Sequence, residues 1–277
     1  MNAKRIRQLA ALLLAAATVA CAQTAFAKED PKARLAKAEA MFAERCKKAG
    51  VFIHRTAENV EGVLLKKLRP KGINYGDQYR MDDPYGHDSG GETYIKTFFA
   101  GFYRIPENPT PQWRRRLGYH YVEALDEKDN KRYRYTGSMK AVGRMDATAF
   151  NVQVELKRNP NYDLNIYDFV LDKAPAHGPA PRYGVTYDDI STREERDYWI
   201  AGSSLKVIDL NTNEVMAERI GYMLDRGQGN TSGGRSPWLL AARNACPAFP
   251  SATGIPPVQT DQTRNFVTNI LRPILEK

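Results

Sequence analysis

The sequence lacks a long apolar run outside its extreme N-terminus, so we expect the remainder not to be an integral membrane protein. It also lacks a repeat of fixed period, which excludes solenoids and propellers. Its four histidines are scattered and indicate no common site. What it does contain is 277 residues, 42% of them hydrophobic and 26% charged with both signs interspersed. This composition predicts a soluble globular protein and excludes intrinsic disorder as its overall state.

Residues 1–27 have the composition of a signal peptide for general secretory export. The parts are a positive start (Lys4, Arg5, Arg7), an apolar stretch (Leu9–Ala20) and a small-x-small cleavage site (Ala25–Ala27). Thr18–Cys21 resembles a lipoprotein box, which leaves open a lipidated Cys21 that would tether the protein to a membrane. We therefore expect a periplasmic protein, with membrane attachment only if Cys21 is lipidated.

The leader carries three cations and no acid, so its removal lowers the formal net charge from +9 to +6. This mild basicity makes nucleic acid a poor default partner for an exported protein. It leaves an acidic protein or an anionic lipid surface as alternatives.

Cleavage after Ala27 leaves two cysteines, Cys46 and Cys246, and an oxidising compartment allows them a single pairing. We predict a Cys46–Cys246 disulfide, with two unrelated thiols as the alternative. Such a bond brings the two ends of the mature chain together. It favours one domain over residues 28–277, with a two-lobe split near the proline-rich segment 173–182 left open.

Local patterns predict an α+β fold, an antiparallel β-sheet meander with N-terminal and C-terminal helices. A first helix is expected from Asp30 and Pro31 to Gly50, because Asp caps and Pro suits the first turn. Strands are expected at 51–55, 60–68, 117–125, 131–142, 150–157, 199–210 and 214–224, a loop at 70–91, and short helices at 237–245 and 264–271. Polar turns at 126–130 and 211–213 predict two hairpins.

The loop Gly86–Gly91 resembles the nucleophile loop of trypsin-like proteases, with Ser89 between Asp88 and two glycines. His54 is too close in sequence to serve as its base in that fold, so a glycine-rich surface loop is the preferred interpretation. Five side chains of the same region could hold a divalent cation, namely Asp77, Asp82, Asp83, His87 and Asp88. Their spacing matches no standard calcium loop, and polar loop residues that bond their own backbone explain the composition equally well. We assign no catalytic residue, metal ligand or cofactor.

Two pairs of acids, Asp188-Asp189 and Glu194-Glu195, lie in a segment that also contains Arg193 and Arg196. We interpret this segment as a solvated charged turn, because acid–base catalysis would need two carboxylates in one cleft.

A predicted hairpin carries the most specific surface chemistry in the sequence. The candidate partner-binding residues are Trp113, Arg114, Arg115 and Arg116 before its first strand, and Arg132 and Arg134 on its second. Alternation places Tyr133 and Tyr135 on the opposite face from Arg132 and Arg134. Arg, Tyr and Trp are enriched at binding hot spots, whereas an ordinary amphipathic hairpin is the alternative.

Several motifs of the last third of the chain resemble a group of uncharacterised exported proteins of Gram-negative bacteria. They are Asp197–Leu205, Ala217–Tyr222, Arg235–Trp238 and Ala245–Pro247, with Arg45-Cys46 and Met81–Gly86 as extensions. The resemblance implies an immunity partner of a secreted antibacterial lipase, and it brings no catalytic assignment.

The leading hypothesis is a non-enzymatic periplasmic protein that binds a protein partner, in particular a secreted toxin that it neutralises. One alternative is a periplasmic hydrolase that uses the Asp82–Ser89 loop. Another is an envelope structural lipoprotein, for which a lipidated Cys21 would be the indicator. Neither partner identity nor oligomeric state follows from the sequence.

Overall fold

The computed structural model describes residues 29–71, 78–79, 84–86, 90–99, 118–126, 128–249 and 259–274. The chain divides into two compact units, Met1–Lys37 and Ala38–Lys277, and every described strand belongs to the second. The expected signal peptide and the residues Trp113–Arg116 lie outside the described residues. Of the Asp82–Ser89 loop, the structure describes only Pro84–Gly86, one turn of 3₁₀ helix named η2.

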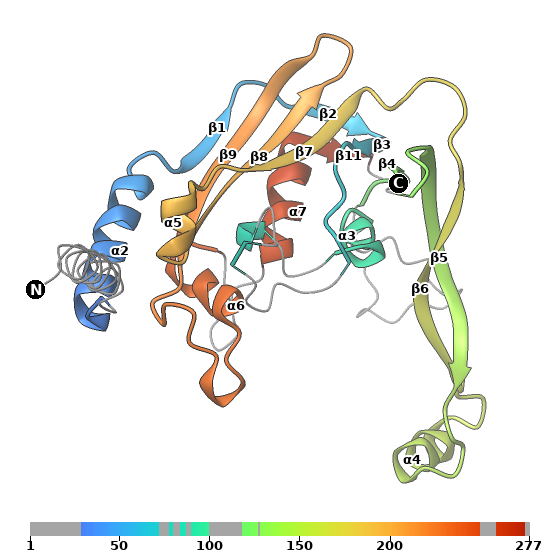
Figure 1. The fold of residues 1–277 in the computed structure, drawn as a ribbon. Helices are drawn as coiled ribbons and strands as arrows, with labels where there is room; N and C mark the ends of the chain where they lie inside the picture. Colours follow the sequence, from blue (N-terminus) through green and yellow to red (C-terminus); the bar gives the residue numbers. More distant parts are fainter. Residues whose placement is uncertain are drawn as a thin grey trace, which may run out of the picture. The chain divides into compact units, whose positions relative to one another are not determined.

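Eight strands form one mixed sheet in the order β1-β9-β8-β7-β3-β4-β5-β6, and a ninth, β10, also pairs with β9 (Figure 1). The strands are β1 Gly50–Ile53, β3 Gly62–Leu65, β4 Tyr121–Leu125, β5 Arg132–Arg144, β6 Asn165–Pro175, β7 Tyr183–Asp189, β8 Ile200–Asp209, β9 Glu214–Leu224 and β10 Ala245–Cys246. A second, two-stranded sheet pairs β2 Ala57–Val60 with β11 Leu271–Pro273. The α+β class is therefore confirmed.

The sheet is not a single antiparallel meander as expected. It contains two three-stranded antiparallel meanders, β4-β5-β6 and β7-β8-β9, and β3 lies between them, parallel to both β4 and β7. Parallel neighbours are reached by long connections rather than by tight turns, so turn chemistry cannot reveal them. The short run Gly62–Leu65 is almost fully buried, as is usual for a central parallel strand.

Six helices have described bounds: α2 Pro31–Cys46, α3 Glu92–Thr97, α4 Phe150–Arg158, α5 Arg193–Asp197, α6 Pro237–Ala241 and α7 Gln259–Ile270. The expected first helix is present, and Asp30 Oδ2 accepts a hydrogen bond from the Ala33 N–H at 2.9 Å. It ends at Cys46 rather than at Gly50, which instead begins β1. The expectation of helices only at the two ends is wrong, because α3, α4 and α5 lie between strands.

The segment 150–157, predicted as a strand, is the helix α4. Its apolar residues alternate in sequence, but the segment connects the far ends of β5 and β6, and β4, β5 and β6 already use one another as partners. A helix satisfies its backbone hydrogen bonds internally, so it forms here without a neighbouring strand. Only Val152 of α4 is buried.

The main core lies between the sheet and the segments of α3 and α7 (Figure 1). The two helical segments contribute Tyr94, Ile95, Phe98, Phe99, Phe266, Val267 and Ile270. The sheet contributes inward side chains of β3, β4, β7, β8 and β9, among them Leu65, Val122, Tyr187 and Leu205. Burial of these apolar side chains holds the two meanders and β3 together in one sheet.

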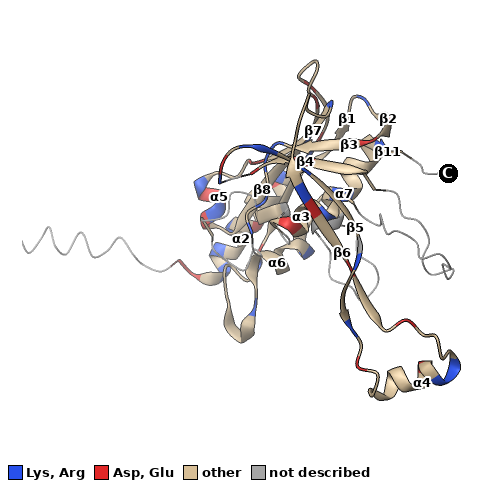
Figure 2. Cartoon of the chain, turned by 90° about the vertical axis from the view of Figure 1, so that its right-hand side faces the viewer, with Lys and Arg blue, Asp and Glu red and all other residues tan. Residues whose placement is uncertain are grey.

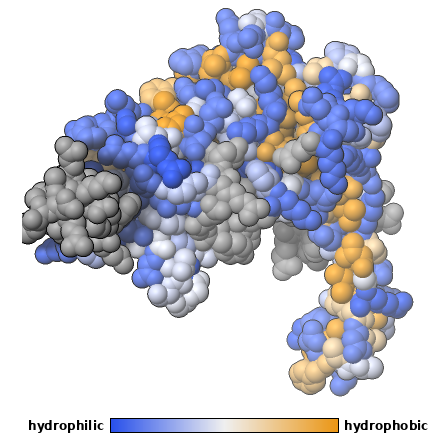
Figure 3. Space-filling view, viewed as in Figure 1, coloured by the Kyte–Doolittle hydropathy of each residue, from blue (hydrophilic) through white to orange (hydrophobic). Residues whose placement is uncertain are grey.

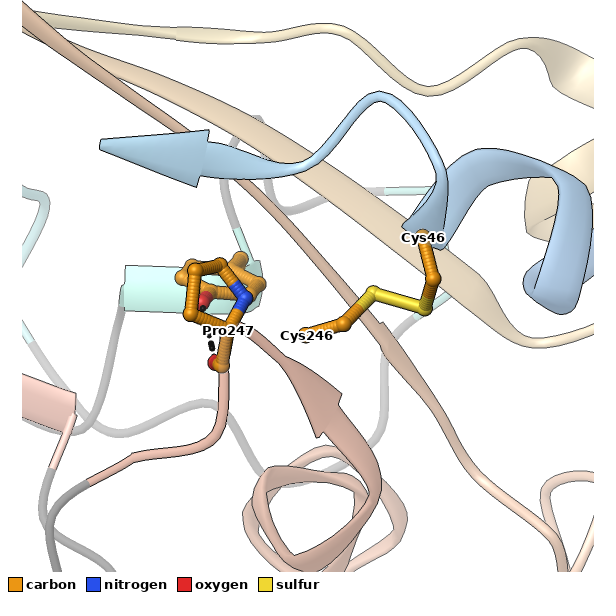
Figure 4. Close-up of a disulfide and its surroundings, with 4 residues drawn as sticks. Cys46, Cys246 and Pro247 are labelled. Atoms are coloured by element: carbon orange, nitrogen blue, oxygen red, sulfur yellow. Dashed lines mark hydrogen bonds between the residues drawn. A yellow bond between two sulfur atoms is a disulfide. The ribbon is translucent and has the colours of Figure 1, made fainter. Parts of the chain in front are cut away.

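The Cys46–Cys246 disulfide predicted from the sequence is present, with the two Cα atoms 5.6 Å apart (Figure 4). It joins the end of α2 to β10, and β1 and β10 both pair with β9, at Ala217–Ile220 and Tyr222–Met223 respectively. Two segments 200 residues apart in sequence thus share one edge of the sheet, and the disulfide fixes them to each other.

Candidate functional site

The β4–β5 hairpin carries those candidate binding residues that the structure describes. The two strands form the hairpin that the sequence predicted around 126–130, and the structure sets its register from Val122–Tyr135 to Leu125–Arg132. Asp126 accepts a hydrogen bond from the Lys128 N–H at 2.9 Å, and Asp129 accepts one from the Lys131 N–H at 3.0 Å. These side-chain bonds to the local backbone form the turn that fixes the register of the hairpin.

Arg132 and Arg134 converge on the buried carboxylate of Glu123. The Glu123 carboxylate lies 3.0 Å from Arg132 Nε and 2.8 Å from Arg134 Nη2, and its side chain is inaccessible to solvent. Arg134 also stacks over the Tyr121 ring at 3.9 Å. Two cations against one acid leave a net positive charge, and the guanidinium groups are held in fixed positions by hydrogen bonds and stacking.

A hollow of about 420 Å³ adjoins this cluster, and its lining joins the start of β5 to the end of β6. It is lined by Lys131, Arg132, Tyr133, Pro175 and Ala176. Arg132 contributes to it while also donating a hydrogen bond to the Gly178 carbonyl oxygen. Cationic and aromatic side chains thus surround a surface depression at the base of the β5–β6 pair.

Tyr133 and Tyr135 alternate with the arginines along β5, as predicted. Tyr135 is buried in the main core, and this burial raises the pKa of its hydroxyl. Tyr133 donates a hydrogen bond from its hydroxyl to Asp129 at 2.8 Å, and this bond raises the pKa of Tyr133. Lys173 of β6 lies 4.0 Å from the centre of the Tyr133 ring. One face of the hairpin therefore anchors it to the core, and the other presents the arginines.

Beyond Tyr135, β6 is the only described strand that pairs with β5, and the two strands continue as a two-stranded ribbon with α4 at its tip (Figure 1). Phe150, the first residue of α4, is 85% exposed. Val142, Ile166 and Tyr167, near the tip of the ribbon, are also exposed large hydrophobic residues. Figure 3 shows the corresponding hydrophobic surface along the ribbon. We call these four residues the apolar tip.

The charged residues of the ribbon are of both signs, with Lys157 and Arg158 in the last turn of α4 (Figure 2). Lys140 and Asp172 form an exposed ion pair across the two strands at 2.7 Å. Pairs of this kind contribute little stability, and an isolated two-stranded ribbon is marginal in water. Four large, exposed apolar side chains therefore lie on a projection that only β5, β6 and α4 form among the described elements.

Six of the other residues that the sequence singled out lie outside the described residues, namely Asp77, Asp82, Asp83, His87, Asp88 and Ser89. His54 follows β1, His120 precedes β4, and His177 lies in the loop after β6. Asp189 of the acidic segment pairs with Arg196 at 3.1 Å. Glu194 and Glu195 belong to α5 rather than to a solvated turn, and the buried Glu195 completes a capping box with Thr192 and pairs with Arg45. That interpretation of the segment is therefore wrong for Glu195, whose carboxylate has a structural role.

Within the described ranges, no group of three His, Cys, Asp or Glu side chains is placed to hold a metal ion. The helices described there are also too short or too polar to cross a membrane.

Sequence reasoning found the base of this surface and missed its apolar tip. The structure reveals the tip through strand length, because β5 and β6 are 13 and 11 residues long whereas β4 is 5. Because β5 and β6 extend well past the end of β4, their outer parts pair with each other and with no further described strand. The assignment of 150–157 to a strand concealed this mismatch.

Comparisons with protein-family models, curated proteins and solved structures gave no match to this chain. The resemblance to exported proteins of Gram-negative bacteria stays a prediction, and the function is argued from the surface itself.

Proposed function

We propose that this chain is a non-enzymatic exported protein that binds a protein partner through the β4–β5–β6 meander, and that the partner is a secreted toxin which it neutralises. The observation that carries the proposal is the apolar tip, four large and exposed apolar residues near the end of a ribbon formed by the two strands β5 and β6. Burial in a partner would remove this surface from water.

The composition of the apolar tip suits a protein cleft. Phe150 and Tyr167 each offer a large contact area, and the charged residues nearby are of both signs. Aromatic residues surrounded by mixed polar groups are typical of the centre of a protein–protein interface. The Glu123–Arg132–Arg134 cluster at the base adds hydrogen-bond donors in fixed positions, which favour recognition of acidic groups.

The test is affinity purification of the tagged protein from its own envelope fraction, with quantification of co-purifying proteins by mass spectrometry. Phe150→Asp removes the most exposed apolar side chain of the tip and places an acid at the first turn of α4, where the helix dipole tolerates it. We expect recovery of a stoichiometric partner by the wild type and a loss of affinity of about thirtyfold with Phe150→Asp.

The matched control is Asn151→Asp, because Asn151 is the exposed neighbour of Phe150 and the change adds the same charge without loss of apolar surface. It should retain the partner. Equal recovery by Phe150→Asp and Asn151→Asp would contradict the role of the tip. Absence of any stoichiometric partner of the wild type would contradict the binding function itself.

A second variant tests the base of the surface. Arg134→Gln removes one of the two cations at Glu123 while Arg132 still pairs with the carboxylate. We expect weaker binding at low salt and a smaller salt dependence, because the variant has lost a cation of the recognition surface. Unchanged binding by a folded Arg134→Gln protein would confine the interface to the apolar tip.

A further inference from the structure

The sheet has a second exposed feature, at the end opposite to β6. β1 is the last strand in the sheet order, so one of its two backbone edges has no neighbouring strand within the described sheet. Val51, Phe52 and Ile53 are 49%, 44% and 54% exposed. Three consecutive large apolar residues on an open edge are uncommon, because such an edge is a template for the addition of another strand.

The backbone of β1 is oriented for strand addition. The His54 N–H donates to the Met216 carbonyl oxygen at 2.9 Å, so His54 faces β9. Alternation along an antiparallel pair then turns the N–H and C=O groups of Val51 and Ile53 away from β9, toward the open edge. Two residues with outward donors and acceptors can therefore form hydrogen bonds with an extended segment.

A hollow of about 450 Å³ adjoins the end of β1 and is lined by His54, Arg55, Glu214, Val215 and Met216. Val215 contributes exposed apolar surface to it. The lining of the hollow comes from the two residues that follow β1 and from the first three residues of β9, so the hollow lies where β1 ends. Backbone bonding along an edge together with a side-chain pocket is the arrangement by which β-strand addition gains both affinity and specificity.

The charges on either side of β1 indicate which kind of peptide segment would bind at its edge. Residues 47–56 contain three cations, one histidine and no acid. Lys47 pairs with Glu44, and Arg55 pairs with Asp209 and Glu214, whereas Lys48 is exposed. Lys48 therefore gives the start of β1 a positive charge that no ion pair among the described residues offsets, and segment 47–56 adds no acid of its own. This arrangement is complementary to an extended apolar segment with acidic flanks, most of all at the end that lies beside Lys48.

A second copy of this chain fits less well. Its β1 would carry the same cationic flanks, and four paired residues per strand form an interface far below the roughly 1,000 Å² of a stable dimer.

We propose that the open edge of β1 binds an extended, acid-flanked apolar segment of a partner protein by β-strand addition. The disulfide supports this edge, because it fixes Cys46, four residues before β1, to β10 on the same side of β9. The edge is thus held in its binding conformation in the free protein, which lowers the entropic cost of association. This site is separate from the apolar tip and does not depend on the function proposed for it.

The test is a titration of the purified, isotope-labelled chain with a synthetic peptide, followed by NMR. The peptide alternates Val and Thr over five residues and has two Glu residues at each end; a second peptide has Lys in place of Glu. We expect shifts and slower hydrogen exchange at the Val51 and Ile53 amides with the first peptide. The second peptide should bind more weakly, because its charge has the same sign as the flanks of β1.

Val51→Pro removes one outward N–H donor, and Gly50 before it accommodates a following proline. The matched control Val51→Thr keeps the N–H and the branched shape. We expect the affinity of Val51→Pro to be about tenfold below that of Val51→Thr. If Val51→Pro does not fold, the double variant Val51→Lys with Ile53→Lys keeps both donors, and its added charges and lost apolar surface should weaken binding similarly.

Three results would overturn the proposal. The first is the absence of any change at the β1 amides at millimolar acid-flanked peptide. The second is equal affinity of Val51→Pro and Val51→Thr. The third is a wild-type dimer in sedimentation that Val51→Pro abolishes, because the edge would then hold a second copy. Loss of peptide binding with retention of an envelope partner through the apolar tip would leave the function proposed above intact.

Discussion

The two meanders of the sheet have the same local topology and very different surroundings. Both contain three antiparallel strands, and the first strand of each is parallel to β3. In the β7-β8-β9 meander, β8 is buried over nearly its whole length, and α5, α7 and η2 pack on it. In the β4-β5-β6 meander, most of β6 is exposed, and among the described strands the outer part of β5 pairs with β6 alone.

The two meanders have the same strand pairing and differ in how far other elements bury their strands. We therefore expect the buried meander to resist unfolding more than the exposed one. Two buried acids lie at strand ends of the buried meander, Asp209 at the end of β8 and Asp225 directly after β9, and each is paired with arginine. The exposed ribbon relies on solvent-exposed pairs such as Lys140–Asp172, which contribute little. The β7-β8-β9 meander therefore has more packing support from other elements than the β5–β6 ribbon has.

The largest change in stability should follow removal of the disulfide. This bond links the end of α2 to β10, which pairs with β9, the outer strand of the buried meander. Cys46→Ser together with Cys246→Ser should lower the free energy of unfolding by 2 to about 5 kcal/mol, because the bond closes a loop of about 200 residues in the unfolded chain. Denaturant titration measures the change, and reductant should no longer affect the variant. An unchanged midpoint would mean that packing alone holds β1 and β10 on β9.

A smaller change in stability should distinguish the two meanders when one glycine of each is replaced by alanine. A Cβ at Gly221 in β9 would overlap the buried Tyr85 ring, whereas a Cβ at Gly143 in the ribbon would lie 3.7 Å from Ile166 Cδ1. We expect Gly221→Ala to cost about 1–3 kcal/mol of unfolding free energy and Gly143→Ala to change it by less than about 0.5. Thermal or urea unfolding of both variants compares them. Equal costs would contradict the difference in packing density between the two halves.

The smallest effect should appear as a dependence of stability on pH. The hydrogen bond from Arg182 holds the pKa of Asp209 below its ordinary value. A carboxylate with a depressed pKa stabilises the folded state above its unfolded pKa of about 4, and this contribution is lost as the pH falls through the folded pKa. Asp209→Asn should therefore be less stable than the wild type at pH 7, and the difference should shrink toward pH 3.

Urea titrations at pH 7, 5 and 3.5 measure this convergence. The charge-matched control is Asp172→Asn, which removes a carboxylate from the exposed pair with Lys140 and should change stability little at pH 7. A constant difference between Asp209→Asn and the wild type at all three pH values would contradict a role for the Asp209 charge.

Local sequence signals predicted the elements whose hydrogen bonds are local. The start of α2 at Asp30 and Pro31, the 126–130 turn and the β8–β9 hairpin around Asn211–Asn213 all follow from capping or turn chemistry within a few residues. Of the candidate site, this reasoning found Arg132 and Arg134 and their alternation with tyrosines. It did not find Glu123 as their common partner, because Glu123 lies on the other strand, and the distance between two side chains on different strands depends on register.

By itself, the sequence determined the α+β class, the disulfide pairing and the hairpin turns, because each depends on composition, on a unique pair of cysteines or on a few adjacent residues. Only the tertiary structure decided that β3 lies parallel between two meanders, that residues 150–158 form a helix, and that β1 and the ribbon tip stay exposed. These outcomes depend on which distant segments cover which faces. Whether a segment is buried depends on contacts with residues that are distant in sequence, so a local sequence pattern does not predict it.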